Sequence, residues 1–90
     1  MVARRMTLTL HARTQARRRG IAVPLMMAVA RAPDEILLDD RGREVRQSEI
    51  LDEDTGKTYL LRVVVEIDGG DAKVITVYKT SKLAKYRGSR

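Results

Sequence analysis

The chain of 90 residues contains no cysteine, tryptophan or phenylalanine, and it has a single histidine. It therefore has neither disulfides nor a thiolate metal site, and one histidine does not make a zinc centre. No apolar run reaches the roughly 18 residues of a membrane span, and the start lacks the basic-then-apolar pattern of a secretory signal. We expect one domain over residues 1–90, located in a reducing cytoplasm and working without a metal or cofactor.

Acidic residues are missing from both ends of the chain. Residues 1–31 carry seven arginines and no acid, residues 32–72 have a net charge of −7, and residues 73–90 have a net charge of +6. If the fold brings the two basic ends together, they form one positive surface for a polyanion. Two frayed basic tails are the alternative, and an arginine-rich, acid-free N-terminus also resembles a mitochondrial presequence.

Residues 11–21 predict a short basic helix. Thr9 is suited to cap its start, and Gly20 is suited to the left-handed backbone that commonly ends a helix. One face of this helix combines a proton donor or acceptor with fixed cations, as the handling of a phosphodiester requires. Solvated surface is the alternative interpretation. The residues of this face recur at i, i+4, i+7 and i+8, and are His11, Gln15, Arg18 and Arg19.

The remaining pattern indicates an α+β domain. A short strand over 6–10 precedes the basic helix, and Pro24 suits the first turn of a second, apolar helix that stops at Ala32-Pro33. Alternation then predicts strands over 35–39, 44–51, 58–67 and 72–79, followed by a short helix from Thr80 to Gly88. We expect two short helices packed on an antiparallel sheet of about four strands, with a short C-terminal helix.

The last predicted hairpin allows its register to be predicted. A two-residue turn at Gly69-Gly70 gives three opposed pairs, which are Glu66 with Lys73, Val64 with Ile75, and Arg62 with Val77. The more apolar face is expected to pack against the helices. Its members are Leu61, Val63, Val65, Ile67, Val74, Thr76 and Tyr78.

Two blocks of the sequence resemble an uncharacterised small-domain family grouped with BrnT-like and RelE/ParE-like toxins. The first block comprises His11-Ala12, Arg19-Gly20-Ile21 and Ala32-Pro33-Asp34-Glu35-Ile36, and the second comprises residues 74–82 with Lys85-Tyr86. The family is placed with the compact α+β ribonucleases that include barnase, the colicin nucleases and RelE. The resemblance covers essentially the whole chain and implies a single RelE/BrnT-like domain. An arginine is usual in the family where this chain has Gln15.

The resemblance implies a metal-independent endoribonuclease toxin that an antitoxin protein neutralises. Such enzymes cleave RNA by attack of the ribose 2′-OH on the neighbouring phosphate, which requires a base, an acid and cations. A histidine side chain ordinarily titrates near pH 6.5, at about the value that acid–base work needs, and a guanidinium binds phosphate with two hydrogen bonds. The implied catalytic residues are His11, Arg19, Arg62, Tyr78, Lys79 and Thr80. The residues expected to hold nucleic acid are Arg13, Arg17, Arg18, Lys82 and Lys85.

Structural roles and other functions stay open. Thr76 on the helix-facing side favours packing over chemistry, and Arg62 could pair with acids of the middle segment. A non-catalytic protein that binds RNA or DNA is one alternative function. A regulatory or interaction subunit on the same fold is another, for which Gln15 is the hint. The sequence also leaves open whether the chain is a monomer or a homodimer.

Overall fold

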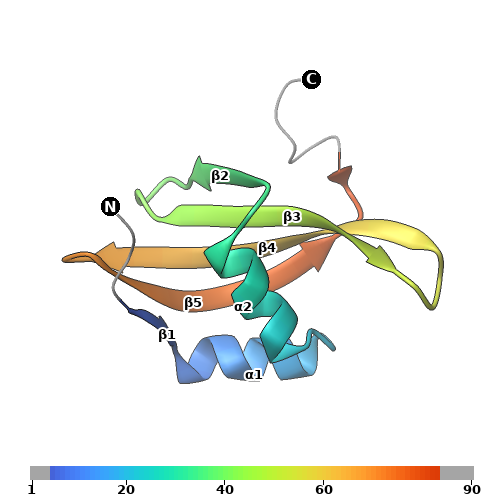
Figure 1. Cartoon of the computed structure of the whole chain (residues 1–90), viewed down its shortest axis with the longest axis horizontal. Coiled ribbons are helices and arrows are strands. Elements are labelled where there is room, and N and C mark those ends of the chain that lie inside the picture. The colour runs from blue at the N-terminus through green and yellow to red at the C-terminus, as the bar shows by residue number, and fades with distance from the viewer. Residues whose placement is uncertain (1–4, 84–90) are drawn as a thin grey trace.

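Two helices pack on one face of a five-stranded sheet in the computed structural model, which describes residues 5–83 (Figure 1). The sheet order is β1-β5-β4-β3-β2, with β1 parallel to β5 and every other neighbouring pair antiparallel. The elements in chain order are β1 (Met6–Leu8), α1 (Leu10–Arg18), α2 (Val23–Arg31), β2 (Glu35–Leu38), β3 (Glu44–Asp52), β4 (Lys57–Asp68) and β5 (Asp71–Thr80).

The α+β class is confirmed, but the predicted sheet is wrong in strand number and direction. It has five strands rather than about four, because residues 6–8 add to the edge of β5, with Met6 opposite Ala72 and Leu8 opposite Val74. The sheet is mixed because this added strand runs parallel to β5. Alternation in the sequence identifies a strand, but it carries no information about the direction of the strand's neighbour.

The prediction of a short C-terminal helix that starts at Thr80, with Thr80 or Ser81 as its cap, is also wrong. The long strand β4 offers a partner as far as its fourth residue, Leu60, and Thr80 pairs with that residue as the last member of β5. Of residues 80–83, Thr80 belongs to β5, and only Leu83, at the limit of the described residues, has a helical backbone. The rest of the predicted helix, up to Gly88, lies outside the described residues.

The ends of both helices agree with the sequence signals. The hydroxyl of Thr9 accepts a hydrogen bond from the backbone N–H of Ala12 at 3.0 Å, which caps α1. Gly20 follows α1 with a φ of +68°, a backbone conformation that favours glycine. Pro24 lies in the first turn of α2, where a missing N–H costs no hydrogen bond. Neither helix of the described chain is long and apolar enough to cross a membrane.

The core lies between the two helices and the strands beneath them. Ala12 and Ala16 are fully buried, and their small side chains let α1 pack closely on β5. From α2 and its approach the core takes Ile21, Met26, Val29 and Ala30, and from the sheet it takes Leu61, Val63, Val65, Ala72, Val74 and Val77. The predicted inward positions of Leu61, Val63, Val65 and Val74 are therefore confirmed.

A β-bulge in β5 changes the register of the last hairpin. Glu66 opposes Lys73 as predicted, but the pairing shifts between Val64 and Val65. The extra residue is Ile75, because Val65 pairs with Val74 while Val64 pairs with Thr76. The predicted pairs of Val64 with Ile75 and of Arg62 with Val77 are therefore wrong.

The bulge exchanges the two faces of β5. Beyond it, Val77 packs into the core, whereas Thr76 and Tyr78 lie on the face opposite the helices, contrary to the prediction. One extra residue reverses the side-chain alternation of everything that follows it. Ile75 has no positive φ that would require glycine, so the sequence does not mark the bulge.

Candidate nucleic-acid interface

The outward face of α1 is basic. Its buried side is made by alanines one turn apart, so the larger side chains point away from the sheet. We call the exposed residues of this helix the α1 face, and they are Leu10, His11, Arg13, Thr14, Arg17 and Arg18. The sequence supplies no acid anywhere in residues 1–31 to neutralise it.

The cations of the α1 face are not engaged by other described residues. Arg43 pairs with Asp39 and Arg46 pairs with Glu44, both beside β2 and β3, whereas Arg13, Arg17 and Arg18 have no ion pair with any described residue. At the end of α1, Arg19 Nε donates to Gln15 Oε1 at 3.0 Å. Gln15 therefore adds no charge of its own and holds the Arg19 guanidinium by a hydrogen bond.

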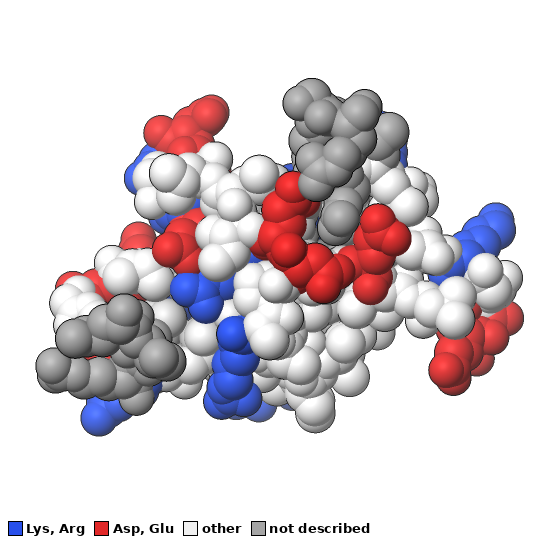
Figure 2. Space-filling view, turned by 45° about the horizontal axis from the view of Figure 1, so that its top comes forward, with Lys and Arg blue, Asp and Glu red and all other residues white. Residues whose placement is uncertain are grey.

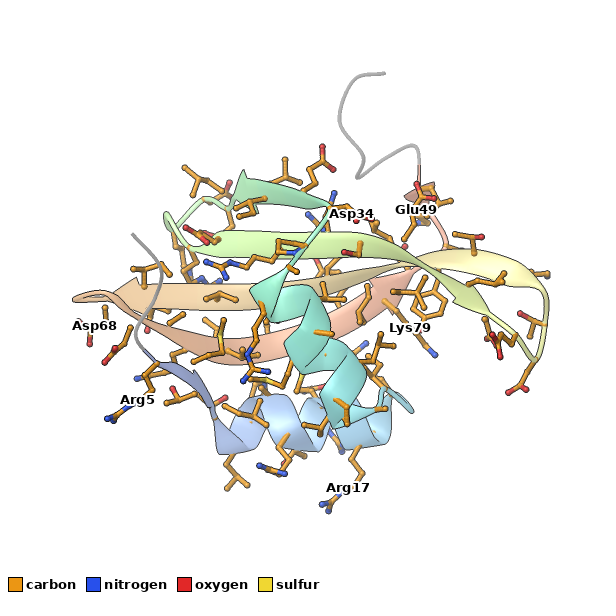
Figure 3. The ribbon with its side chains drawn as sticks, in the orientation of Figure 1. Arg5, Arg17, Asp34, Glu49, Asp68 and Lys79 are labelled. Atoms are coloured by element: carbon orange, nitrogen blue, oxygen red, sulfur yellow. The ribbon has the colours of Figure 1, made fainter. Side chains whose placement is uncertain are left out.

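The α1 face and the acidic segment of residues 32–51 lie at opposite edges of the sheet. α1 and β1 lie along one edge of the sheet, and β2 and β3 form the other. Figure 2, which brings the β2–β3 edge forward, shows acidic side chains gathered near the centre of the view. In Figure 3, Arg5 and Arg17 project from the α1 edge, whereas Asp34 and Glu49 lie at the opposite edge. Because α1 packs on β5, the described parts of the two basic ends do lie side by side.

The predicted catalytic residues fall on two sides of the sheet. His11 lies on α1 and Arg19 follows the helix as its C-cap. Lys79 lies on the same side of the sheet, with its Nζ 5.2 Å from the centre of the Tyr59 ring. Arg62, Tyr78 and Thr80 lie on the opposite face of the sheet. Arg62 and Tyr78 are each next in sequence to a residue of the core beneath the helices, and Thr80 follows Tyr78 by two positions on the same strand. The structure therefore does not bring His11 together with Arg62 and Tyr78.

Of the two predicted binding residues that follow β5, the structure describes Lys82. Lys82 is exposed just after the strand, and its backbone N–H donates to the hydroxyl of Thr80 at 3.1 Å. Lys85 lies outside the described residues. Of the residues that were expected to hold nucleic acid, the α1 face contains Arg13, Arg17 and Arg18.

A polar ladder crosses four strands on the face opposite the helices. Gln47 Nε2 donates to Glu35 Oε1 at 2.6 Å, and Arg62 Nε donates to Gln47 Oε1 at 2.8 Å. Arg62 Nη1 donates to Tyr78 Oη at 2.7 Å, with the guanidinium carbon 5.6 Å from the centre of the Tyr78 ring. Each of these neighbours is a directly opposed pair in the sheet register.

Burial indicates that this polar ladder is structural. Gln47 is fully buried and Arg62 is only 7% exposed, and buried polar groups of this kind need hydrogen-bond partners to offset lost hydration. Sequence reasoning named Arg62 and Tyr78 as catalytic candidates and missed Glu35 and Gln47. The available signal was Gln47 itself, a polar residue in phase with Val45 on β3.

A groove of about 670 Å³ lies between the β3–β4 hairpin and the start of α2 with the connection that precedes it. Its lining is of mixed charge, with Lys79 facing the acidic hairpin residues 52–54. Burial, with the nearby Asp52 carboxylate, raises the pKa of Tyr59 above its ordinary value. No group of three or more potential metal-ligating side chains occurs in residues 5–83. The groove does not include His11, so it adds no partner to the only histidine.

Comparisons with models of protein families, with curated proteins and with solved structures give no match to this chain. The resemblance drawn from the two ends of the sequence stays a prediction, as do the roles that it implies for individual residues.

Proposed function

We propose that this protein binds nucleic acid through the α1 face, without cleaving it. The observation that carries the proposal is the exposure of Arg13, Arg17 and Arg18 on one short helix, with no ion pair to any residue of the described chain. Exposed guanidinium groups bind phosphate oxygens with charge-assisted hydrogen bonds and release condensed counterions. Such binding is strong at low salt and largely independent of base sequence.

The division of the predicted catalytic residues favours binding over cleavage. A general base must lie within about 3 Å of the proton that it takes, and the stabilising cation must reach the same phosphate. His11 and the pair of Arg62 and Tyr78 are on opposite sides of the sheet, so one phosphate does not reach them together. The ribonuclease and antitoxin predictions, and the cytoplasmic location, are not needed for this proposal.

Paired arginine variants test the proposal. The test variant is Arg17→Ala/Arg18→Ala, and the matched control is Arg31→Ala/Arg41→Ala, which removes two exposed arginines from elsewhere. Binding to a fluorescent single-stranded RNA of about 20 nucleotides is measured by anisotropy between 50 and 200 mM salt. We expect the test variant to lose about tenfold or more in affinity at low salt, because each charge-assisted bond contributes roughly 1.5–3 kcal/mol. The slope of log K against log salt should fall by about 1.4, at roughly 0.7 per phosphate contact.

Equal losses in both variants would contradict a specific role for the α1 face and leave only non-specific attraction to a basic protein. The same mixtures, incubated in EDTA with the unmodified protein and with His11→Ala, test the non-catalytic part of the proposal. We expect the RNA to stay intact in both. Fragments that appear with the unmodified protein and not with His11→Ala would overturn that part and restore the ribonuclease prediction.

A further inference from the structure

The edge of the sheet opposite α1 is acidic and carries exposed apolar side chains. Residues 32–51 contain six acids and three arginines, a net charge of −3. Two of those arginines are already paired with acids of the same region. Strand β2 forms this edge of the sheet and leaves Ile36 51% exposed and Leu38 74% exposed. Large apolar side chains at such exposure, grouped on a four-residue edge strand, are typical of a contact surface.

The backbone of β2 also has a free side. Asp39 donates its N–H to the carbonyl oxygen of Arg43 at 2.9 Å, so in this antiparallel pair the odd-numbered residues face β3. The N–H and C=O groups of Ile36 and Leu38 therefore point away from β3, toward the outer edge. Natural proteins often cover an edge strand of this kind with a helix, which prevents it from pairing with strands of other molecules.

We propose that α1 of a second copy of this chain covers the acidic β2 edge, so that copies associate head to tail. α1 offers the complementary surface, with Leu10 78% exposed and in phase with Arg13 and Arg17 at i+3 and i+7. Leu10 of one copy meets Ile36 and Leu38 of the next, and the arginines meet the acids beside β2. Both halves of the contact are present on every copy.

Like-charge repulsion disfavours the simplest alternative, a symmetric contact of β2 with β2. That arrangement places two edges of net charge −3 against each other, whereas the head-to-tail contact opposes unlike charges. A head-to-tail contact joins two different surfaces, so it leaves one free at each end and produces short chains or closed rings. Association must weaken at high salt, because the charged side chains on both surfaces are exposed.

The contact competes with nucleic acid for the same arginines, a consequence that rests on the proposed function. The acidic β2 edge of one copy takes the place of phosphates on α1 of the next. Self-association itself does not depend on nucleic-acid binding. Measuring the two separately therefore distinguishes a failure of this inference from a failure of the proposed function.

Sedimentation velocity of complementary variants tests the contact. One variant is Arg13→Glu/Arg17→Glu, the other is Leu38→Lys/Asp40→Lys, and the control is Ile67→Lys/Asp71→Lys, which makes the same kind of change at the β4–β5 turn. At 50 mM salt and 10–300 μM protein, we expect the unmodified chain and the control to associate. Each test variant alone should sediment as a monomer. Their equimolar mixture should associate again, because it contains one intact surface of each kind.

A monomeric unmodified chain across that concentration range at low salt would overturn the inference. It would also be overturned if Arg13→Glu/Arg17→Glu still associated while the β2 variant did not, since β2 would then bind something other than α1. Adding the RNA oligonucleotide is expected to dissociate the assembly. RNA that binds while the assembly persists would overturn the shared use of α1.

Discussion

Arginines on the two sides of the sheet differ in what surrounds them. Arg62 lies in the polar ladder, 7% exposed, and donates to Gln47 and Tyr78. Arg17 and Arg18 extend from α1 into solvent and have no partner among the described residues. A buried guanidinium with satisfied hydrogen bonds stabilises the fold, whereas an exposed one is available to a ligand. Residue type alone therefore does not distinguish a structural arginine from a binding arginine. The presence or absence of hydrogen-bond partners within the fold does.

The largest expected effect comes from removing the buried member of this comparison. Arg62→Met keeps the length of the side chain but leaves Gln47 and Tyr78 without their donor. We expect the free energy of unfolding to fall by about 3 kcal/mol or more, measured by urea denaturation. Arg31→Met, at an exposed position on α2, should change it by less than about 0.5 kcal/mol. A loss below about 1 kcal/mol for Arg62→Met would contradict a structural role for the polar ladder.

A smaller effect is expected from enlarging the buried side of α1. Ala16→Leu adds volume where the helix touches the sheet, at a fully buried site, and should cost about 1–3 kcal/mol through overpacking. Ala28→Leu, at an exposed site on α2, serves as the control. The free energy of unfolding of Arg17→Ala/Arg18→Ala should equal that of the unmodified protein, by both thermal and urea denaturation. The buried side of α1 would then contribute to stability, and its exposed side would not. If Ala16→Leu is as stable as its control, α1 is not packed as described.

The Thr9 cap of α1 should contribute about 1 kcal/mol to the free energy of unfolding. The hydroxyl of Thr9 accepts from Ala12 N at 3.0 Å and donates to the carbonyl oxygen of Val74 at 3.0 Å, so it joins the helix start to β5. Thr9→Ala removes both bonds, whereas Thr9→Ser keeps the hydroxyl. Urea denaturation should show the alanine variant clearly below the serine variant. Equal stabilities would mean that neither bond stabilises the native state.

The smallest effect concerns the turn between β2 and β3. Burial raises the pKa of Asp39, but the N–H groups of Arg43 and Arg41 and the Arg43 guanidinium more than offset this and hold the pKa below its ordinary value of 3.8. Because the pKa of Asp39 is lower in the native state than in the unfolded state, its ionised carboxylate stabilises the fold at any pH above the unfolded-state pKa. That stabilisation is lost as the pH falls through the native-state pKa. The stability difference between the unmodified protein and Asp39→Asn should therefore shrink on acidification below about pH 4. A difference that stays constant from pH 6 to pH 2.5 would contradict this coupling.

The helices were the most predictable part of the fold, because their signals are local. A threonine cap, a glycine after the last turn and a proline in the first turn identified α1 and α2. The parallel pairing of β1 with β5 and the bulge at Ile75 depend on contacts between distant segments, and no residue marks them. The bulge matters most, because it places Tyr78 rather than Val77 opposite Arg62 and so completes the polar ladder. It also takes Tyr78 away from the side on which His11 lies.

The most direct test of this account maps where RNA contacts the protein. Amide signals in a ¹⁵N–¹H correlation spectrum are followed as a single-stranded RNA oligonucleotide is added at low salt. The account predicts that the largest shifts fall on α1 and the residues that follow it, over 10–20, with little change at Glu35, Gln47, Arg62 and Tyr78. Large shifts at those four residues, with α1 unchanged, would contradict it and place the binding surface on the opposite face of the sheet.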